Sequence, residues 1–426
     1  MTKEVLKEID PTKDWVVDDT NLRTDYELTI IKELAKPRVV VLAIPVLFQT
    51  IAGRALKLLF PQMTPYTKAH PYSLRWNSNP YNLHNGYWHC SPDIVLEVNE
   101  TAFYTYLRFY VNEEKVSPPN LYENFLKALR EASRGVICNL SAGEVFSSDW
   151  GDEDEEEAAE VPTFLLDEAF TSPFEKIDIT MDEFLSFYPT EVVLSFKRVI
   201  QMVDTIANEP ASGLHFSALI AGPPGTGKSL FSTLLAKYAA EEKKALVIFA
   251  SGVSGFEVIH DAIKLFPLVL FIFDECEFLA QNREQRPTKE LIYIMQLLDG
   301  YAYKSYASWG IIFTTNRPHT IDPAFLRPIR MDELIELSPI QNGRFGLEVF
   351  RYYCKKLGLE DLPELEERIF EGRTHAECAA LAHKVYRMKK FGKEVSVEEI
   401  KSLLKDISKW SRPQKIKGSI EEKTGF

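Results

Sequence analysis

The feature that most constrains this chain is the stretch GPPGTGKS, Gly222 to Ser229. It lies between the apolar run HFSALIA and the helix-forming run LFSTLLAKYAAE. Glycines let backbone N–H groups curl around an anion without a Cβ in the way. The helix that follows points the positive end of its dipole at the same place. The spacing GxxxxGK[ST], after a strand and before a helix, therefore predicts a loop that binds the phosphates of a nucleotide.

The loop also predicts individual roles. Lys228 is expected to reach the β- and γ-phosphates, and Ser229 is expected to ligate Mg²⁺. The residues predicted to contact the nucleotide here are Gly222, Pro223, Pro224, Gly225, Thr226, Gly227, Lys228, Ser229 and Leu230.

A second acidic site follows the apolar run LVLFIF, at Asp274 and Glu275. A parallel strand delivers its carboxyl end to the ligand crevice, so these acids are expected beside the phosphate loop. We expect Asp274 to hold Mg²⁺ through water, and Glu275 to take a proton from the attacking water or to orient it. The plainer interpretation is a pair of surface acids after a buried strand.

Apolar runs and helical patterns alternate from about residue 176 onward. Such alternation predicts a parallel sheet with helices on both faces. Strands are expected at 215–221, 245–251, 268–275 and 309–315, and helices at 191–206, 228–241, 256–266 and 289–298. Residues 342–410 are nearly all helical in pattern and predict a small helical subdomain.

A third motif begins at Thr315, where the chain reads TNRPHTIDPAFLRPIRMD. It has the form Thr-Asn, five residues, Asp-x-Ala, two residues, Arg, two residues, Arg, one residue, Asp. This pattern resembles the second region of homology of the AAA ATPases. Together with GPPGTGKS and FIFDE in the same order, it makes residues from about Phe174 to Arg412 similar to the AAA family proper. Within that family, several stretches resemble the ATPases that translocate the Rieske protein in mitochondria, and their bacterial relatives.

The resemblance implies further roles. Asn316 resembles sensor 1, which hydrogen-bonds the γ-phosphate or the lytic water. Arg327 and Arg330 resemble arginine fingers, which act in trans on ATP in the neighbouring subunit; the alternative for each is a surface ion pair with Asp322 or Asp332. The family's cofactors are ATP and Mg²⁺, and trans fingers imply a homo-oligomeric ring, usually a hexamer. His375 and Ala376 stand where the family places a Gly-Ala pair against the adenine.

The expected fold is therefore an α/β P-loop AAA+ parallel sheet, with helices on both faces and a C-terminal helical lid, preceded by an α+β N-terminal domain. Expected bounds are 1–175 for the N-terminal domain, 176–337 for the nucleotide-binding core and 338–426 for the lid and tail. The N-terminal domain would end in an acidic linker or loop at about 148–160, which contains the run DEDEEE.

Residues 1–175 carry no motif that names a function. VVVLAI predicts a buried strand, followed by a helix from Pro45. Its buried face would carry Leu47, Ile51, Ala55 and Leu58. DIVLEV and AFYTYLRFYV predict a hairpin, and residues 122–134 predict a helix. The apolar run at 39–48 is too short to cross a bilayer, and Arg54 and Lys57 interrupt its extension, which argues against a membrane segment.

Composition narrows the function classes. The net charge of −13 argues against a long nucleic-acid groove, because phosphate backbones are bound by clustered Lys and Arg. Five cysteines with no metal-ligand spacing favour a reducing compartment, and MTKEVLKEID is unlike a secretory signal. A cytoplasmic location is expected.

Three functions remain open. The first is a ring that hydrolyses ATP and remodels, translocates or disassembles a protein client recruited by the N-terminal domain. The second is an ATP-controlled assembly or signalling module that does not thread a chain. It gains from the region 251–256, SGVSGF, which lacks an aromatic–hydrophobic–glycine pore loop, although Val253 or Phe256 could face a pore. The third is a nucleic-acid motor.

Overall fold

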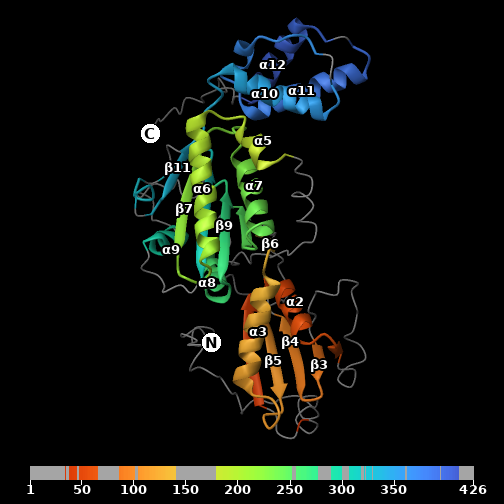
Figure 1. The fold of residues 1–426 in the computed structure, drawn as a ribbon, viewed down its shortest axis with the longest axis vertical. Helices are drawn as coiled ribbons and strands as arrows, with labels where there is room; N and C mark the ends of the chain where they lie inside the picture. Colours follow the sequence, from red (N-terminus) through yellow and green to blue (C-terminus); the bar gives the residue numbers. More distant parts are fainter. Residues whose placement is uncertain are drawn as a thin grey trace, which may run out of the picture.

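The computed structural model of the 426-residue chain describes a set of ranges that between them contain two sheets and a helical C-terminal part. Figure 1 shows these parts in succession, with the helical part and the five-stranded sheet at opposite ends of the six-stranded one. The described residues are 34, 38–45, 48–65, 86–100, 104–140, 179–251, 256–276, 289–299, 307–317, 321, 323–328, 330–359, 362–393 and 395–411. The expected acidic segment at 148–160 and the pore residue Val253 lie outside them.

The six-stranded sheet has the order β11-β7-β10-β9-β8-β6, and all its pairings are parallel. Its strands are buried and almost wholly apolar, as expected when both faces of a parallel sheet are covered. Five of its strands follow residue 214 in the sequence: β7 (His215–Ala221), β8 (Leu246–Ser251), β9 (Leu268–Asp274), β10 (Ser308–Thr315) and β11 (Glu333–Glu336).

Helices cover both faces of this sheet. Because side chains alternate along a strand, Ile312 of β10 packs into the cluster with α6 (Thr190–Asn208) and α7 (Lys228–Glu241). Its neighbour Ile311 packs into the opposite cluster, with α8 (Phe256–Leu265) and α9 (Lys289–Leu298). The expected α/β sheet with helices on both faces is confirmed.

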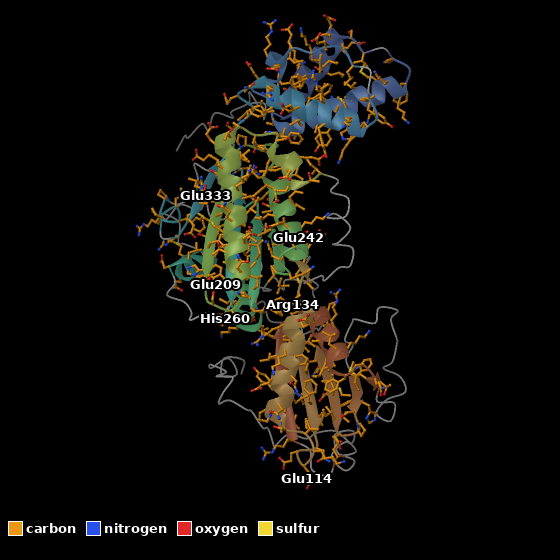
Figure 2. The ribbon with its side chains drawn as sticks, viewed as in Figure 1. Glu114, Arg134, Glu209, Glu242, His260 and Glu333 are labelled. Atoms are coloured by element: carbon orange, nitrogen blue, oxygen red, sulfur yellow. The ribbon has the colours of Figure 1, made fainter. Side chains whose placement is uncertain are left out.

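Arg198 of α6 is tied to the edge of the sheet by a bidentate ion pair. Its Nε and one terminal nitrogen donate to Glu333 of β11, at 2.8 and 2.6 Å. Figure 2 shows the labelled Glu333 beside α6. Glu333 is 9% exposed, so this pair is sheltered on one side. It pins the short β11, which follows the predicted arginine motif, against the core.

The sixth strand comes from the N-terminal side of the sequence. β6 (Ile137–Leu140) pairs with β8 in parallel, with Ile137 opposite Val247 and Leu140 opposite Ala250. It follows α3 (Pro118–Ala132) after one short turn. The six-stranded sheet thus takes its edge strand from before the domain boundary expected near residue 175.

The N-terminal part is a five-stranded antiparallel sheet with the order β1-β5-β4-β3-β2. Its strands are β1 (Arg38–Pro45), β2 (Thr64–Pro65), β3 (Gly86–Ser91), β4 (Ile94–Glu100) and β5 (Tyr104–Val111). The predicted hairpin is present as β4 and β5, and the helices α2 (Gln49–Leu59) and α3 pack on the same sheet.

The helix expected from Pro45 begins later, as α2 (Gln49–Leu59). Ile51 and Ala55 are buried as expected, together with Ala52 and Leu56, whereas Leu58 is 56% exposed. The prediction for Leu58 was therefore wrong. The buried stripe of α2 runs along positions 51, 52, 55 and 56, so position 58 lies at one edge of the stripe, in the last turn of the helix.

One buried cluster joins the N-terminal sheet to the core. Phe48, which is fully buried, packs its ring edge-on against Phe266 at the end of α8, with centroids 4.8 Å apart. Arg130 of α3 donates from Nε to the carbonyl of Leu265 at 3.4 Å. The labelled Arg134 and His260 lie where the two parts meet (Figure 2). The Phe48–Phe266 contact and the pairing of β6 with β8 thus connect the N-terminal part to the six-stranded sheet and its helices.

The C-terminal part is the helical subdomain that the sequence predicts. It consists of α10 (Gly343–Lys356), a short 3-10 helix η5 (Glu367–Phe370), α11 (His375–Lys390) and α12 (Val397–Ser411). It shares a buried cluster with α6, α7 and the short helix α5 (Met181–Leu185). None of the helices that the structure describes combines the length and apolar character needed to cross a membrane.

Candidate functional site

The glycine-rich loop leaves β7 at Ala221 and enters α7 at Lys228. Gly227 caps the helix with φ +97°, a left-handed conformation that suits glycine. A Cβ at this position would lie 2.0 Å from the hydroxyl of Tyr188, so the close approach also requires glycine. No side chain caps the first turn of α7, and its N–H groups are therefore directed at the loop, as an anion site requires.

Lys228 is buried within the loop that it is expected to serve. Its ammonium donates to the carbonyls of Gly222 and Pro223, at 2.7 and 2.9 Å. The Thr226 hydroxyl donates to the same Pro223 carbonyl at 2.8 Å. The lysine side chain therefore lies along the loop, with its charge at the concave side where phosphates would bind.

The predicted acids lie beside the loop, as the parallel topology requires. β9 ends at Asp274, and the Ser229 hydroxyl donates to Asp274 Oδ1 at 3.2 Å. A hydroxyl and a carboxylate supply oxygen ligands of the kind that Mg²⁺ prefers. The protein would provide these two ligands, and phosphate oxygens and water molecules would complete the coordination shell. The two residues predicted to hold the metal are thus brought together, 45 positions apart in sequence.

Glu275 and Asn316 also meet. Asn316, one residue beyond the end of β10, donates from Nδ2 to Glu275 Oε1 at 3.3 Å. Glu275 is exposed, with φ +56°, which is unusual for a residue with a side chain. This backbone conformation directs the Glu275 carboxylate towards Asn316, whereas the Asp274 carboxylate faces Ser229. The predicted base and sensor are therefore neighbours at the carboxyl edge of the sheet.

A residue that sequence reasoning missed connects these groups. Thr314 of β10 is fully buried, and its hydroxyl lies between Asp274 Oδ1, at 2.5 Å, and the backbone N–H of Glu275, at 2.9 Å. The only sequence signal was the pair of threonines before Asn316. Which of the two reaches the acids depends on the pleat of β10, and the sequence does not fix it.

The two predicted arginine fingers have different surroundings. Arg330 is 11% exposed and binds Asp299 through two nitrogens, at 2.5 and 2.6 Å, and the Ala324 carbonyl at 2.8 Å. The Arg330 guanidinium holds the pKa of Asp299 below its usual range, chiefly by hydrogen bonding. The Arg327 side chain is exposed, and within the described ranges no hydrogen bond or ion pair is seen for its guanidinium, although its charge also contributes to lowering the pKa of Asp299. The sequence did not distinguish these two roles.

The lid reaches the loop through the start of α11. Thr374 caps this helix by accepting from the Glu377 N–H, and Glu377 accepts from the Thr374 N–H, so the sequence THAE forms a capping box. The Ala376 N–H donates to the Gly225 carbonyl at 3.0 Å. The two residues expected at the adenine, His375 and Ala376, are thus at the first turn of a helix that contacts the phosphate loop.

His375 is held by two aromatic neighbours. Its ring stacks on Tyr188 with centroids 4.4 Å apart, and Nε2 lies 3.1 Å from the Phe187 carbonyl. Tyr188 in turn donates to the Thr226 carbonyl at 2.6 Å. Burial lowers the pKa of His375 to about 4, so the ring is neutral at pH 7. Its Nδ1 is buried and has no hydrogen-bond partner among the residues that the structure describes. An unmet polar atom beside the loop fits a bound nucleotide.

Of the remaining predicted contacts, Pro223 and Pro224 are exposed at the tip of the loop. Leu230 is partly buried, on the first turn of α7 after Ser229. Phe256 begins α8, but its side chain lies outside the described part, as does the rest of the predicted pore segment.

Comparisons with known proteins agree with this geometry. The model of the family described as "ATPase family associated with various cellular activities (AAA)" matches residues 218–339. The proteasome-activating nucleotidase of Methanocaldococcus jannaschii is 33% identical over 203 residues, which are 42% of this chain and 44% of the relative. That of Thermococcus onnurineus is 31% identical over 202 residues, 42% of this chain and 48% of the relative.

The chain therefore spans less than half the length of these curated relatives. The family match covers the last four residues of β7, the loop, the strands β8 to β11 and the arginine motif. A glycine-rich loop that opens α7, two acids at the end of β9 and a polar residue at the end of β10 occur together within it. Residues 218–339 of this chain are an AAA ATPase domain.

Proposed function

We propose that this chain binds and hydrolyses ATP with Mg²⁺, and that it uses the hydrolysis, as a ring of like subunits, to remodel protein clients. The observation that carries the proposal is the meeting of Ser229, Asp274, Glu275 and Asn316 beside the glycine-rich loop. Surface acids without a function would have no reason to gather at the one edge of the sheet where a phosphate loop opens.

The residues divide the chemistry as follows. Lys228 and the N–H groups of the loop hold the phosphates, while Ser229 and Asp274 supply oxygen ligands for Mg²⁺. Bound Mg²⁺ neutralises charge on the phosphate oxygens. Glu275 orients the attacking water or takes its proton, and Asn316 positions the Glu275 carboxylate or the water. His375 and Ala376 close the base end of the site from the lid.

Arg327 is our candidate for the finger that acts in trans. Its guanidinium is exposed and is always charged, and it can bind phosphate oxygens through two donors. Arg330 was predicted for the same role. Its donors are directed at Asp299 and Ala324 of the same chain, so a finger role for Arg330 would require that ion pair to open. We assign Arg330 to holding the segment that presents Arg327.

The ring and the client are proposed from the relatives. Those compared above are named proteasome-activating nucleotidases. A finger in trans needs a neighbouring subunit, which supports a homo-oligomeric ring, with a hexamer as the expected size. The N-terminal sheet is the candidate client-binding part. The five cysteines, all buried and none of them in a disulfide, support the reducing, cytoplasmic location that the sequence predicts.

A trap tests this function. Glu275→Gln should bind ATP and Mg²⁺ without turning ATP over, and it would be tagged and used to capture partners from native extract with ATP or with ADP. A protein enriched only with ATP is the expected result. Nuclease-sensitive nucleic acid would instead favour a motor, and capture of the chain's own subunits alone would favour an assembly switch. Either of these outcomes would overturn the client-remodelling function.

A further inference from the structure

We propose that Thr314 is a positioning residue that fixes both acids of the catalytic edge, Asp274 and Glu275, through its hydroxyl. The inference rests on the proposed ATP hydrolysis and adds to it a residue that neither the sequence motifs nor the comparisons assign. Thr314 lies on β10, one position beyond the registered pair Phe313 and Phe273, and therefore opposite Asp274 at the end of β9.

The hydroxyl of Thr314 has one proton to donate and lone pairs with which to accept. It donates to Asp274 Oδ1 at 2.5 Å, in the range of charge-assisted O–H···O⁻ bonds. It accepts from the Glu275 N–H at 2.9 Å. A single buried hydroxyl is therefore bonded to the side chain of one acid and to the backbone of the next.

The first of these bonds sets the direction of the proposed metal ligand. Asp274 Oδ1 also accepts from Ser229 at 3.2 Å, so the same oxygen faces the loop and the sheet. Without the Thr314 bond the carboxylate would be free to rotate about its side-chain torsions. Groups that hydrogen-bond a metal ligand typically change metal affinity or activity 10- to 100-fold when they are removed.

The second bond holds an unfavourable backbone conformation. Glu275 has φ +56°, a strained conformation that a residue with a side chain keeps only where its surroundings impose it. Thr314 imposes it from two sides, because its carbonyl also accepts from the Cys276 N–H at 2.8 Å. Two hydrogen bonds to Thr314, one from the Glu275 N–H and one from the Cys276 N–H, thus hold the turn that directs the Glu275 carboxylate towards Asn316.

The residues packed around Thr314 hold its side chain in one conformation. Thr314 is fully buried, and the rings of Phe273 and Phe313, one position earlier on the two strands, stack with centroids 5.6 Å apart. Both strands are central in the sheet, with β10 between β7 and β9. A side chain held in this way keeps its rotamer, so the acids that it contacts keep theirs.

The test compares Thr314→Val, which keeps the shape and loses the hydroxyl, with Thr314→Ser, which keeps the hydroxyl. Full-length proteins would be assayed for ATP hydrolysis over a range of Mg²⁺ concentrations, and for ATP binding in excess chelator. For Thr314→Val we expect kcat to fall about 10- to 100-fold and half-activation to need several-fold more Mg²⁺. Metal-free ATP binding should be unchanged, and Thr314→Ser should stay within about threefold of the wild type.

Thr105→Val is the matched control. Thr105 is also a fully buried strand threonine, but its hydroxyl has no partner among the described residues, and it lies in the N-terminal sheet. Its loss should change neither kcat nor the Mg²⁺ requirement. If Thr314→Val does not fold, Thr314→Ala gives the same loss of the hydroxyl without the second methyl group, and the same readouts apply.

Three outcomes would overturn the inference: a wild-type Mg²⁺ profile and kcat in Thr314→Val, equal loss in Thr314→Ser, or equal loss in Thr105→Val. Failure of the proposed function is a separate result, because then the wild-type protein itself would not hydrolyse ATP. An active wild type with an unaffected Thr314→Val would remove only the role of Thr314.

Discussion

Replacing Arg327 and Arg330 one at a time should separate catalysis from structure. Arg327 is exposed, so Arg327→Ala should change the free energy of unfolding by no more than about 0.5 kcal/mol. Its effect should appear in catalysis, because removal of an arginine finger costs about 10³-fold or more in kcat. Arg330 is the opposite case, since its side chain is 11% exposed and its guanidinium makes three hydrogen bonds to described residues, namely Asp299 and Ala324.

The cost of Arg330→Ala follows from what the change leaves behind. Breaking one side of a buried pair costs about 3–5 kcal/mol, because the remaining charge is left without a partner. Asp299 is 26% exposed and can be partly rehydrated, so we expect about 3 kcal/mol, the low end of that range. Arg330→Lys keeps the charge but cannot bind Asp299 through two fixed donors, and it should recover only part of the loss.

Urea unfolding and steady-state ATP hydrolysis measure the two effects, and a mixing experiment tests whether the finger acts in trans. Glu275→Gln subunits keep the finger and lack the base, and Arg327→Ala subunits have the opposite defect. Mixed rings should recover activity at interfaces where an intact base meets an intact finger. No recovery on mixing, or a wild-type kcat in Arg327→Ala, would refute the assignment. Unchanged stability in Arg330→Ala would refute the structural role of Arg330.

Two further predictions concern coupling between parts of the chain. A double-mutant cycle on Phe48→Ala and Phe266→Ala should give a coupling energy of about 0.5–1.5 kcal/mol in unfolding, because the rings pack edge-on at 4.8 Å across the junction; additive effects would contradict that contact. Because the pKa of His375 is lowered to about 4 from 6.5, the unfolded chain binds the extra proton first, and stability should fall by up to about 3 kcal/mol as the pH drops from 6.5 to 4. His375→Phe should flatten this part of the unfolding profile relative to the wild type, and identical profiles would contradict the burial of the ring.

The sequence predicted the nucleotide-binding core closely. β7, α7 and α9 have the predicted bounds, because a buried apolar strand, a glycine loop and a helical repeat all leave strong local signals. The meeting of Ser229 with Asp274 also followed from sequence, since parallel strands end at one edge.

What the sequence missed depends on long-range pairing. ICNL at β6 is too short to be assigned a partner, and ELIE at β11 is equally brief, so neither was placed in the sheet. Both are held by neighbours distant in the chain: β6 by β8, and β11 by β7 and Arg198. Short edge strands have few local determinants, and tertiary pairing decides them.

In the candidate site, too, the sequence does not determine which of two similar side chains makes a given contact. Arg327 and Arg330 look alike within their motif, and only the position of Asp299 separates them. Thr314 and Thr315 are adjacent and both fully buried, yet the hydroxyl of Thr314 is the one that bonds to Asp274. Such choices depend on rotamers and on strand register, which a motif does not encode.

The most direct test of the whole account is ATP turnover by the wild type and by Glu275→Gln, with ATP affinity measured on the same samples. Glu275 touches no phosphate-loop residue in the described bonds, so its replacement should leave ATP binding intact. We predict Mg²⁺-dependent hydrolysis by the wild type, and a loss of turnover in Glu275→Gln of at least about 10²-fold at unchanged affinity. Normal turnover in Glu275→Gln would contradict the assignment of the catalytic edge, and a wild type that binds no ATP would contradict the account as a whole.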